Sequence, residues 1–321
     1  MSEADILEKP LLAEAKFRNP SVTADGHKRA SVRLESLETL WFNTGTLCNL
    51  ECSNCYIESS PTNDRLVYLT VSEVEDFLDE LSAFDTGTKE IAFTGGEPFM
   101  NPDIIAMIEA AASRGYRVLV LSNAMRPMMR FADRLLSLKE CYGRQLTIRV
   151  SLDHYSQPLH DLYRGVRAFE TALEGLRWLS REGFSFSLAG RTFWNESEQD
   201  IRDGFKRLCD REGLSLDPYD PVALTLFPEM DETLDVPEIT EACWSILGVS
   251  PGDMMCATSR MIVKRKGADK PTVLPCTLLP YDTDFELGST LSDAERDVPL
   301  NHPHCARFCV LGGGSCSRAE S

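Results

Sequence analysis

Residues 46–56 read TLCNLECSNCY, and this stretch decides both the fold and the chemistry that we expect. Its three cysteines, Cys48, Cys52 and Cys55, have the spacing C-x3-C-x2-C. An apolar run at 37–42 precedes them, and a turn-forming Asn-Thr-Gly cluster separates the two. The pattern predicts a loop just beyond a strand, on which three thiolates converge on one inorganic centre.

The number of thiolates bears on the kind of centre. A four-iron cluster normally takes four cysteines, so a cluster held by three leaves one iron open to another ligand. An open position is typical of catalytic metal sites, whereas structural sites are closed. The spacing by itself also fits a structural zinc site with a fourth ligand from elsewhere, because zinc binds thiolates too.

Composition narrows the class of protein. The 321 residues are 43% hydrophobic and 26% charged, which is ordinary for a globular protein of one or two domains. A net charge of −17 argues against a nucleic-acid substrate. We find no apolar run near the roughly 20 residues that span a bilayer and no signal-peptide pattern, so we expect a cytoplasmic protein without a membrane partner. In a cytoplasmic protein, eleven cysteines indicate metal or redox chemistry rather than disulfides.

From residue 37 onward, strand-like runs alternate with helical ones. The predicted strands are 37–42, 90–93, 116–121, 145–152, 184–189 and 222–227. Such alternation predicts a parallel α/β sheet, either doubly wound or curled as a partial barrel, with function at the carboxyl ends of the strands. Polar residues follow these ends: the cysteine loop, Gly95-Gly96-Glu97-Pro98, Ser122-Asn123, Ser151 and Asp153, and Arg191.

The alternation stops beyond about residue 237. A hairpin is expected from 260–266 and 271–274, and cysteines flank and follow it: Cys256, Cys276, Cys305, Cys309 and Cys316. With so little apolar periodicity, this part needs a metal to fold. We therefore expect three parts: an N-terminal extension at 1–36 with a hairpin around Asp25-Gly26, a core at 37–239, and a cysteine-rich domain at 240–321.

CNLECSNC followed by a strand that ends in GGEP resembles the radical S-adenosylmethionine (radical SAM) enzyme superfamily, over most of residues 40–230. The resemblance implies a partial (β/α)6 barrel in which Cys48, Cys52 and Cys55 hold a [4Fe-4S] cluster. It also implies that S-adenosylmethionine binds the open iron and is cleaved reductively to a 5′-deoxyadenosyl radical, which abstracts hydrogen from a substrate.

The resemblance also implies a set of cofactor-binding residues. Gly95, Gly96 and Glu97 would receive the methionine ammonium, and Arg191 its carboxylate. Ser122 and Asn123 would lie near the cofactor, and Ser151 and Asp153 near the ribose. Polar residues at strand ends also cap neighbouring helices. Such capping is the alternative to cofactor binding for Ser122, Asn123, Ser151, Asp153 and Arg191. Many members carry an aromatic residue before the third cysteine, where this chain has Asn54, so adenine contacts there stay open.

The C-terminal cysteines resemble the SPASM and shorter twitch domains of the same superfamily, which hold auxiliary clusters. Cys305-x3-Cys309-x6-Cys316 departs from the full SPASM spacing. Five cysteines are too few for two fully ligated four-iron clusters, so we expect one auxiliary iron-sulfur cluster held by four of the five. Zinc is the alternative metal here.

Three functions follow from this sequence. The first is a radical SAM oxidoreductase that oxidises a small molecule and takes electrons from a donor such as flavodoxin or ferredoxin. The second is a radical SAM enzyme that modifies a peptide, as maturases do. The third, from another class, is a zinc-stabilised binding protein without turnover, which leaves GGEP unexplained. We assign no catalytic acid, base or nucleophile from the sequence.

Overall fold

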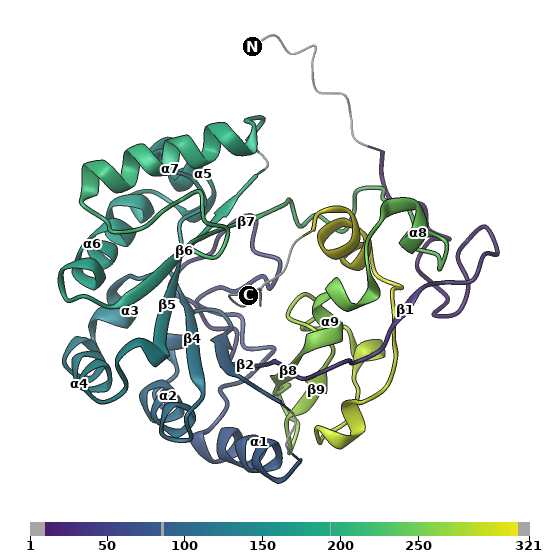
Figure 1. The fold of residues 1–321 in the computed structure, drawn as a ribbon, viewed down its shortest axis with the longest axis horizontal. Helices are drawn as coiled ribbons and strands as arrows, with labels where there is room; N and C mark the ends of the chain where they lie inside the picture. Colours follow the sequence, from purple (N-terminus) through teal and green to yellow (C-terminus); the bar gives the residue numbers. More distant parts are fainter. Residues whose placement is uncertain (1–9, 85–86, 193, 314–321) are drawn as a thin grey trace.

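A computed structural model describes residues 10–84, 87–192 and 194–313. Its centre is an eight-stranded sheet in the order β7-β6-β5-β4-β3-β2-β8-β9, curved as a partial barrel (Figure 1). Neighbouring strands from β7 to β8 run parallel, and β9 is antiparallel to β8. The strands are β2 (Thr39–Asn43), β3 (Glu90–Thr94), β4 (Arg117–Ser122), β5 (Leu146–Ser151), β6 (Ser185–Arg191), β7 (Leu224–Phe227), β8 (Ser259–Val263) and β9 (Thr272–Leu274).

Helices cover the outer face of the curved sheet (Figure 1). Those that connect successive strands are α1 (Val71–Phe84), α2 (Ile104–Ser113), α3 (Arg126–Met129), α4 (Ala132–Tyr142), α5 (Gln157–Arg164), α6 (Ala168–Arg181) and α7 (Glu198–Glu212). The C-terminal part contributes α8 (Cys243–Leu247), α9 (Met255–Thr258) and a π-helix at Cys305–Leu311. No helix of the described ranges is both long and apolar enough to cross a bilayer.

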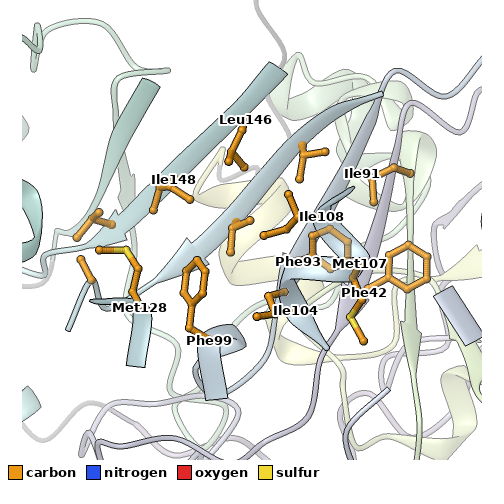
Figure 2. Packing of buried hydrophobic residues seen from close by; sticks show 14 of the residues in the cluster. Phe42, Ile91, Phe93, Phe99, Ile104, Met107, Ile108, Met128, Leu146 and Ile148 are labelled. Atoms are coloured by element: carbon orange, nitrogen blue, oxygen red, sulfur yellow. The ribbon is translucent and has the colours of Figure 1, made fainter. Parts of the chain in front are cut away.

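The main core lies between the sheet and these helices. All five residues of β2 are buried, as expected for a strand covered on both faces. Phe42 stacks on Phe93 of the next strand at a centroid distance of 5.7 Å, and Ile104 and Ile108 of α2 belong to the same buried cluster (Figure 2). This packing holds the carboxyl ends of β2 to β6 at one edge of the barrel, where the site forms.

The predicted strands correspond to β2 to β7, and the prediction of a partial barrel is confirmed. The hairpin expected near residue 260 forms as β8 and β9, but it does not stand apart. Strand β8 pairs in parallel with β2, with Thr39 opposite Ser259. All five residues of β8 are buried, and the pairing covers what would otherwise be an exposed edge of β2.

The N-terminal extension turns at Asp25-Gly26, where Val22 and Lys28 form an antiparallel bridge. Strand β1 (Ser31–Val32) then pairs with β10 (Val298–Pro299) in the C-terminal part. Arg29 forms a buried ion pair with Glu238. The extension therefore packs along the C-terminal part of the chain.

Candidate active site

The start of the cysteine loop is hydrogen-bonded to the sheet. After β2, the backbone amide of Thr44 donates to the carbonyl of Thr94 at 2.8 Å, and the Asn43 side chain accepts the amide of Gly45 at 3.0 Å. Further along, the amide of Cys48 donates to the Ser60 carbonyl, within the same connection, at 3.0 Å. These bonds fix the position of the backbone at the start of the loop and at Cys48.

Cys48, Cys52 and Cys55 line one cavity at the carboxyl ends of the strands. Burial, together with the nearby groups of Glu97, Cys52 and Cys55, raises the pKa of Cys48 to about 12. Three thiols on one cavity wall form a donor set that a metal centre would deprotonate and neutralise. The donor set therefore fits a cluster held by three cysteines.

The GGEP turn is pressed against this loop. A Cβ on Gly96 would lie 2.3 Å from the carbonyl oxygen of Leu47, and one on Gly95 would lie 2.4 Å from that of Gly45. Gly95 also has a φ of +141°, which favours glycine. The glycines thus allow backbone to approach backbone, and both line the cavity next to the cysteines.

Glu97 has a different position from its glycine neighbours. Its buried carboxylate accepts three hydrogen bonds. The donors are the Ser122 hydroxyl at 2.9 Å, the backbone amide of Asn123 at 2.8 Å and the backbone amide of Phe99 at 3.2 Å. Burial raises its pKa to about 7, although these hydrogen bonds lower it. Glu97 therefore fixes the end of β4, and its predicted contact with the methionine ammonium stays a prediction.

Ser122 and Asn123 line the cavity, as do Ser151, the last residue of β5, and Arg191, the last residue of β6. The Asn123 side-chain amide donates to Asn49 at 2.9 Å and lies 4.0 Å from the Cys48 sulfur. The end of β4 is therefore adjacent to the cysteine loop.

An ion-pair cluster forms the opposite wall. Both oxygens of Asp153 accept from Arg164, each at 2.8 Å, and the Arg191 Nε lies 3.7 Å from the same carboxylate. Burial raises the pKa of Asp153, but the charge and hydrogen bonds of Arg164 outweigh it and hold this pKa well below its usual range. The two guanidinium groups and one carboxylate give this wall a net positive charge.

Arg164 was not predicted as a cofactor-site residue. It ends helix α5 just before Gly165, where a basic side chain is typical of a helix C-terminus. The sequence signal that could have pointed to Arg164 was Asp153, because a buried carboxylate needs a cationic partner.

A second group of cysteines meets in the C-terminal part. Cys256, Cys276, Cys305 and Cys309 are all buried and line one enclosed cavity with apolar neighbours such as Leu279. Burial raises the pKa of Cys305 and Cys309 well above the usual value, and the other thiols of the group raise it further. Four of the five predicted ligands are thus brought together, and Cys316 lies outside the described residues.

The two cavities are neighbours. Leu278 lines both of them, and Phe308, between Cys305 and Cys309 in sequence, lines the first. Phe308 stacks on Phe227 of β7 at a centroid distance of 5.6 Å. The apolar end of the first cavity is therefore built by the barrel and the C-terminal part together.

The model of the radical SAM superfamily matches residues 42–208, which is about half of the chain. The chain belongs to the radical SAM superfamily. A [4Fe-4S] cluster and S-adenosylmethionine are accordingly its cofactors, and the three-thiol donor set and open cavity suit them.

Curated relatives of this radical SAM protein act in different biosyntheses. The antilisterial bacteriocin subtilosin biosynthesis protein AlbA of Bacillus subtilis is 29% identical over 163 residues, which cover 49% of this chain and 35% of AlbA. The AdoMet-dependent heme synthase of Oleidesulfovibrio alaskensis is 29% identical over 167 residues, 52% of this chain and 40% of the synthase. The match thus spans well under half of each relative.

Solved structures share the fold of this radical SAM protein. SuiB of Streptococcus suis, bound to the precursor peptide SuiA, superposes with a TM-score of 0.61 and 15% identity, covering 84% of this chain and 66% of SuiB. At that identity the likeness concerns the fold alone.

Proposed function

We propose that this chain is a radical SAM oxidoreductase whose cluster is held by Cys48, Cys52 and Cys55. When bound, the cluster and S-adenosylmethionine supply a 5′-deoxyadenosyl radical that takes a hydrogen atom from a substrate carbon. The proposed cofactor-binding residues of the chain are Gly95, Gly96, Glu97, Ser122, Asn123, Ser151, Asp153 and Arg191. The observation that carries this proposal is one cavity lined by all three cysteines and by residues from the ends of five successive strands, β3 to β7.

The chain's own residues have distinct tasks in this proposal. The two glycines leave backbone polar groups accessible at the cavity wall, and Arg191 supplies a cation for a carboxylate. Asp153 is occupied by Arg164, so we assign it the task of orienting both guanidinium groups. The apolar side chains at the other end, which include Phe227 and Phe308, would exclude water from the substrate carbon.

We further propose that Cys256, Cys276, Cys305 and Cys309 hold one auxiliary iron-sulfur cluster that would accept one electron from the substrate radical as the radical becomes the oxidised product. Four thiols complete the usual ligand set of such a cluster without Cys316. The cavity of these cysteines shares Leu278 with the first cavity, which supports this role. On this basis we divide the chain into a core at 37–239 and an auxiliary-cluster part at 240–321, joined through β2 and β8.

The substrate class has two candidates. The first is a small molecule that the enzyme oxidises. A peptide is the second candidate, since the relatives include AlbA, the mycofactocin maturase MftC of Mycobacterium ulcerans and, in fold, SuiB with its precursor peptide. With either substrate, we propose that an electron donor such as flavodoxin or ferredoxin reduces the cluster.

The test uses protein prepared without oxygen, S-adenosylmethionine and dithionite. We expect slow formation of 5′-deoxyadenosine by the wild type and none by a Cys48→Ala, Cys52→Ala, Cys55→Ala variant. Fractions of a cell extract, separated into small molecules and peptides, are then added, and the fraction that accelerates the reaction identifies the class. A colourless, zinc-containing protein that never cleaves S-adenosylmethionine would instead support the binding-protein alternative.

A further inference from the structure

Arg260, the second residue of strand β8, is a fully buried cation with 0% exposure. Its guanidinium donates to three neutral carbonyls: Nε to Ala294 at 2.9 Å, and Nη1 to Cys256 at 2.6 Å and Ser259 at 2.8 Å. Its Nη2 is buried without a hydrogen-bond partner. Within the described ranges, no carboxylate lies at ion-pair distance from it, so its charge is uncompensated by any acidic side chain there.

A buried cation without a counter-charge is costly, and such groups are normally paired. Arginine does not avoid this cost by losing its proton at neutral pH. The bond from Nη1 to the Cys256 carbonyl places the guanidinium beside the backbone of one of the four cysteines that line the second cavity.

We propose that Arg260 is the fixed counter-charge of the cluster bound by these cysteines and that it raises the reduction potential of this cluster. This inference rests on the proposed auxiliary cluster. Four thiolates leave a bound iron-sulfur core with a net negative charge, and reduction adds one more electron. A nearby cation stabilises the reduced form more than the oxidised form, and the apolar surroundings leave little solvent to screen it.

This assignment gives Arg260 a role in directing electrons. A higher potential makes the second cluster a better acceptor for an electron released in the first cavity, which shares Leu278 as a lining residue with the cavity of the four cysteines. Arg260 is thus a residue that acts through the cluster and touches neither substrate nor cofactor.

The experiment isolates the second cluster in the background of Cys48→Ala, Cys52→Ala, Cys55→Ala. Its potential is measured by redox titration followed by electron paramagnetic resonance, without reference to turnover. Arg260→Gln should shift the reduction equilibrium against the reduced form by about tenfold or more, which is about 59 mV toward negative potential for one electron. Arg260→Lys keeps the charge but not the three carbonyl bonds, and its potential should stay close to that of the parent.

Lys264→Gln is the matched control, because Lys264 follows the same strand but already pairs with Glu73 at 2.5 Å. Its potential should equal that of the parent. An unchanged potential in Arg260→Gln, or an equal shift in Arg260→Lys and Arg260→Gln, would overturn the proposal and leave Arg260 a structural residue. Absence of iron from the parent background would instead refute the auxiliary cluster itself, so the two failures are distinguishable.

Discussion

At the scale of single residues, the site depends on buried charges that are held by specific partners. Asp153 and Arg164 form a two-bond ion pair, and Glu97 accepts three hydrogen bonds at the end of β4. Neither group touches solvent enough to be stabilised by water, so the protein must supply the partners. Changes at these residues should therefore have measurable effects on stability as well as on cofactor binding.

Arg164→Leu should lower the free energy of unfolding by about 3–5 kcal/mol, because it leaves the buried Asp153 with only the more distant Arg191. Adding Asp153→Asn to this variant should recover part of the loss, since the unpaired charge is then gone. Denaturant unfolding of the single and double variants measures both effects. Additive losses would show that the two side chains are not coupled.

Glu97 gives a prediction about pH. Because burial raises its pKa from 4.5 to about 7, the native state binds this proton more tightly than the unfolded state does. Its contribution to stability is present at low pH and falls by about 3 kcal/mol as pH rises through 7. From acidic to alkaline pH, the free energy of unfolding of Glu97→Gln should therefore fall less than that of the wild type. Parallel pH profiles of the two proteins would contradict this assignment.

At the scale of elements, the close contact between the turn after β3 and the cysteine loop positions the first cluster. Gly96→Ala places a Cβ against the backbone carbonyl of Leu47, so the two segments must separate. We expect this variant to lose about four iron atoms per chain. Gly115→Ala is the control: its φ of +91° adds a backbone strain that Gly96 does not have, but nothing lies within 4 Å of the new Cβ. Its iron content should match the wild type, and full iron in Gly96→Ala would show that the contact is dispensable.

The elements also show how far the sequence could lead. The apolar runs predicted β2 to β7, and the polar residues after them predicted which segments meet, because parallel strands end at one edge. The pairing of β8 with β2 was missed because the two strands are about 220 residues apart and local pattern carries no information about partners. Arg164 was missed for a similar reason, since its role depends on a contact between a helix and a strand end.

At the scale of the whole molecule, the barrel and the C-terminal part share a sheet but have separate cavities lined by cysteines. Cys276→Ala should loosen residues 275–311 in hydrogen exchange, because metal binding stabilises a site that is not otherwise held together. Strands β3 and β5 should remain protected by their own core, and β8 by its pairing with β2. Cys209→Ala, at a buried cysteine of α7, is the matched control and should leave 275–311 unchanged. A C-terminal part that stays protected in Cys276→Ala would mean that it folds without metal.

The central claim is that one chain carries two iron-sulfur clusters, one held by three cysteines and one by four. The most direct test is the iron and acid-labile sulfide content of protein prepared without oxygen, compared between the wild type and the variant that lacks Cys48, Cys52 and Cys55. We predict about eight iron atoms per wild-type chain and about four in the variant, with sulfide in equal amounts. A variant that contains no iron, or zinc in place of iron and sulfide, would contradict the claim.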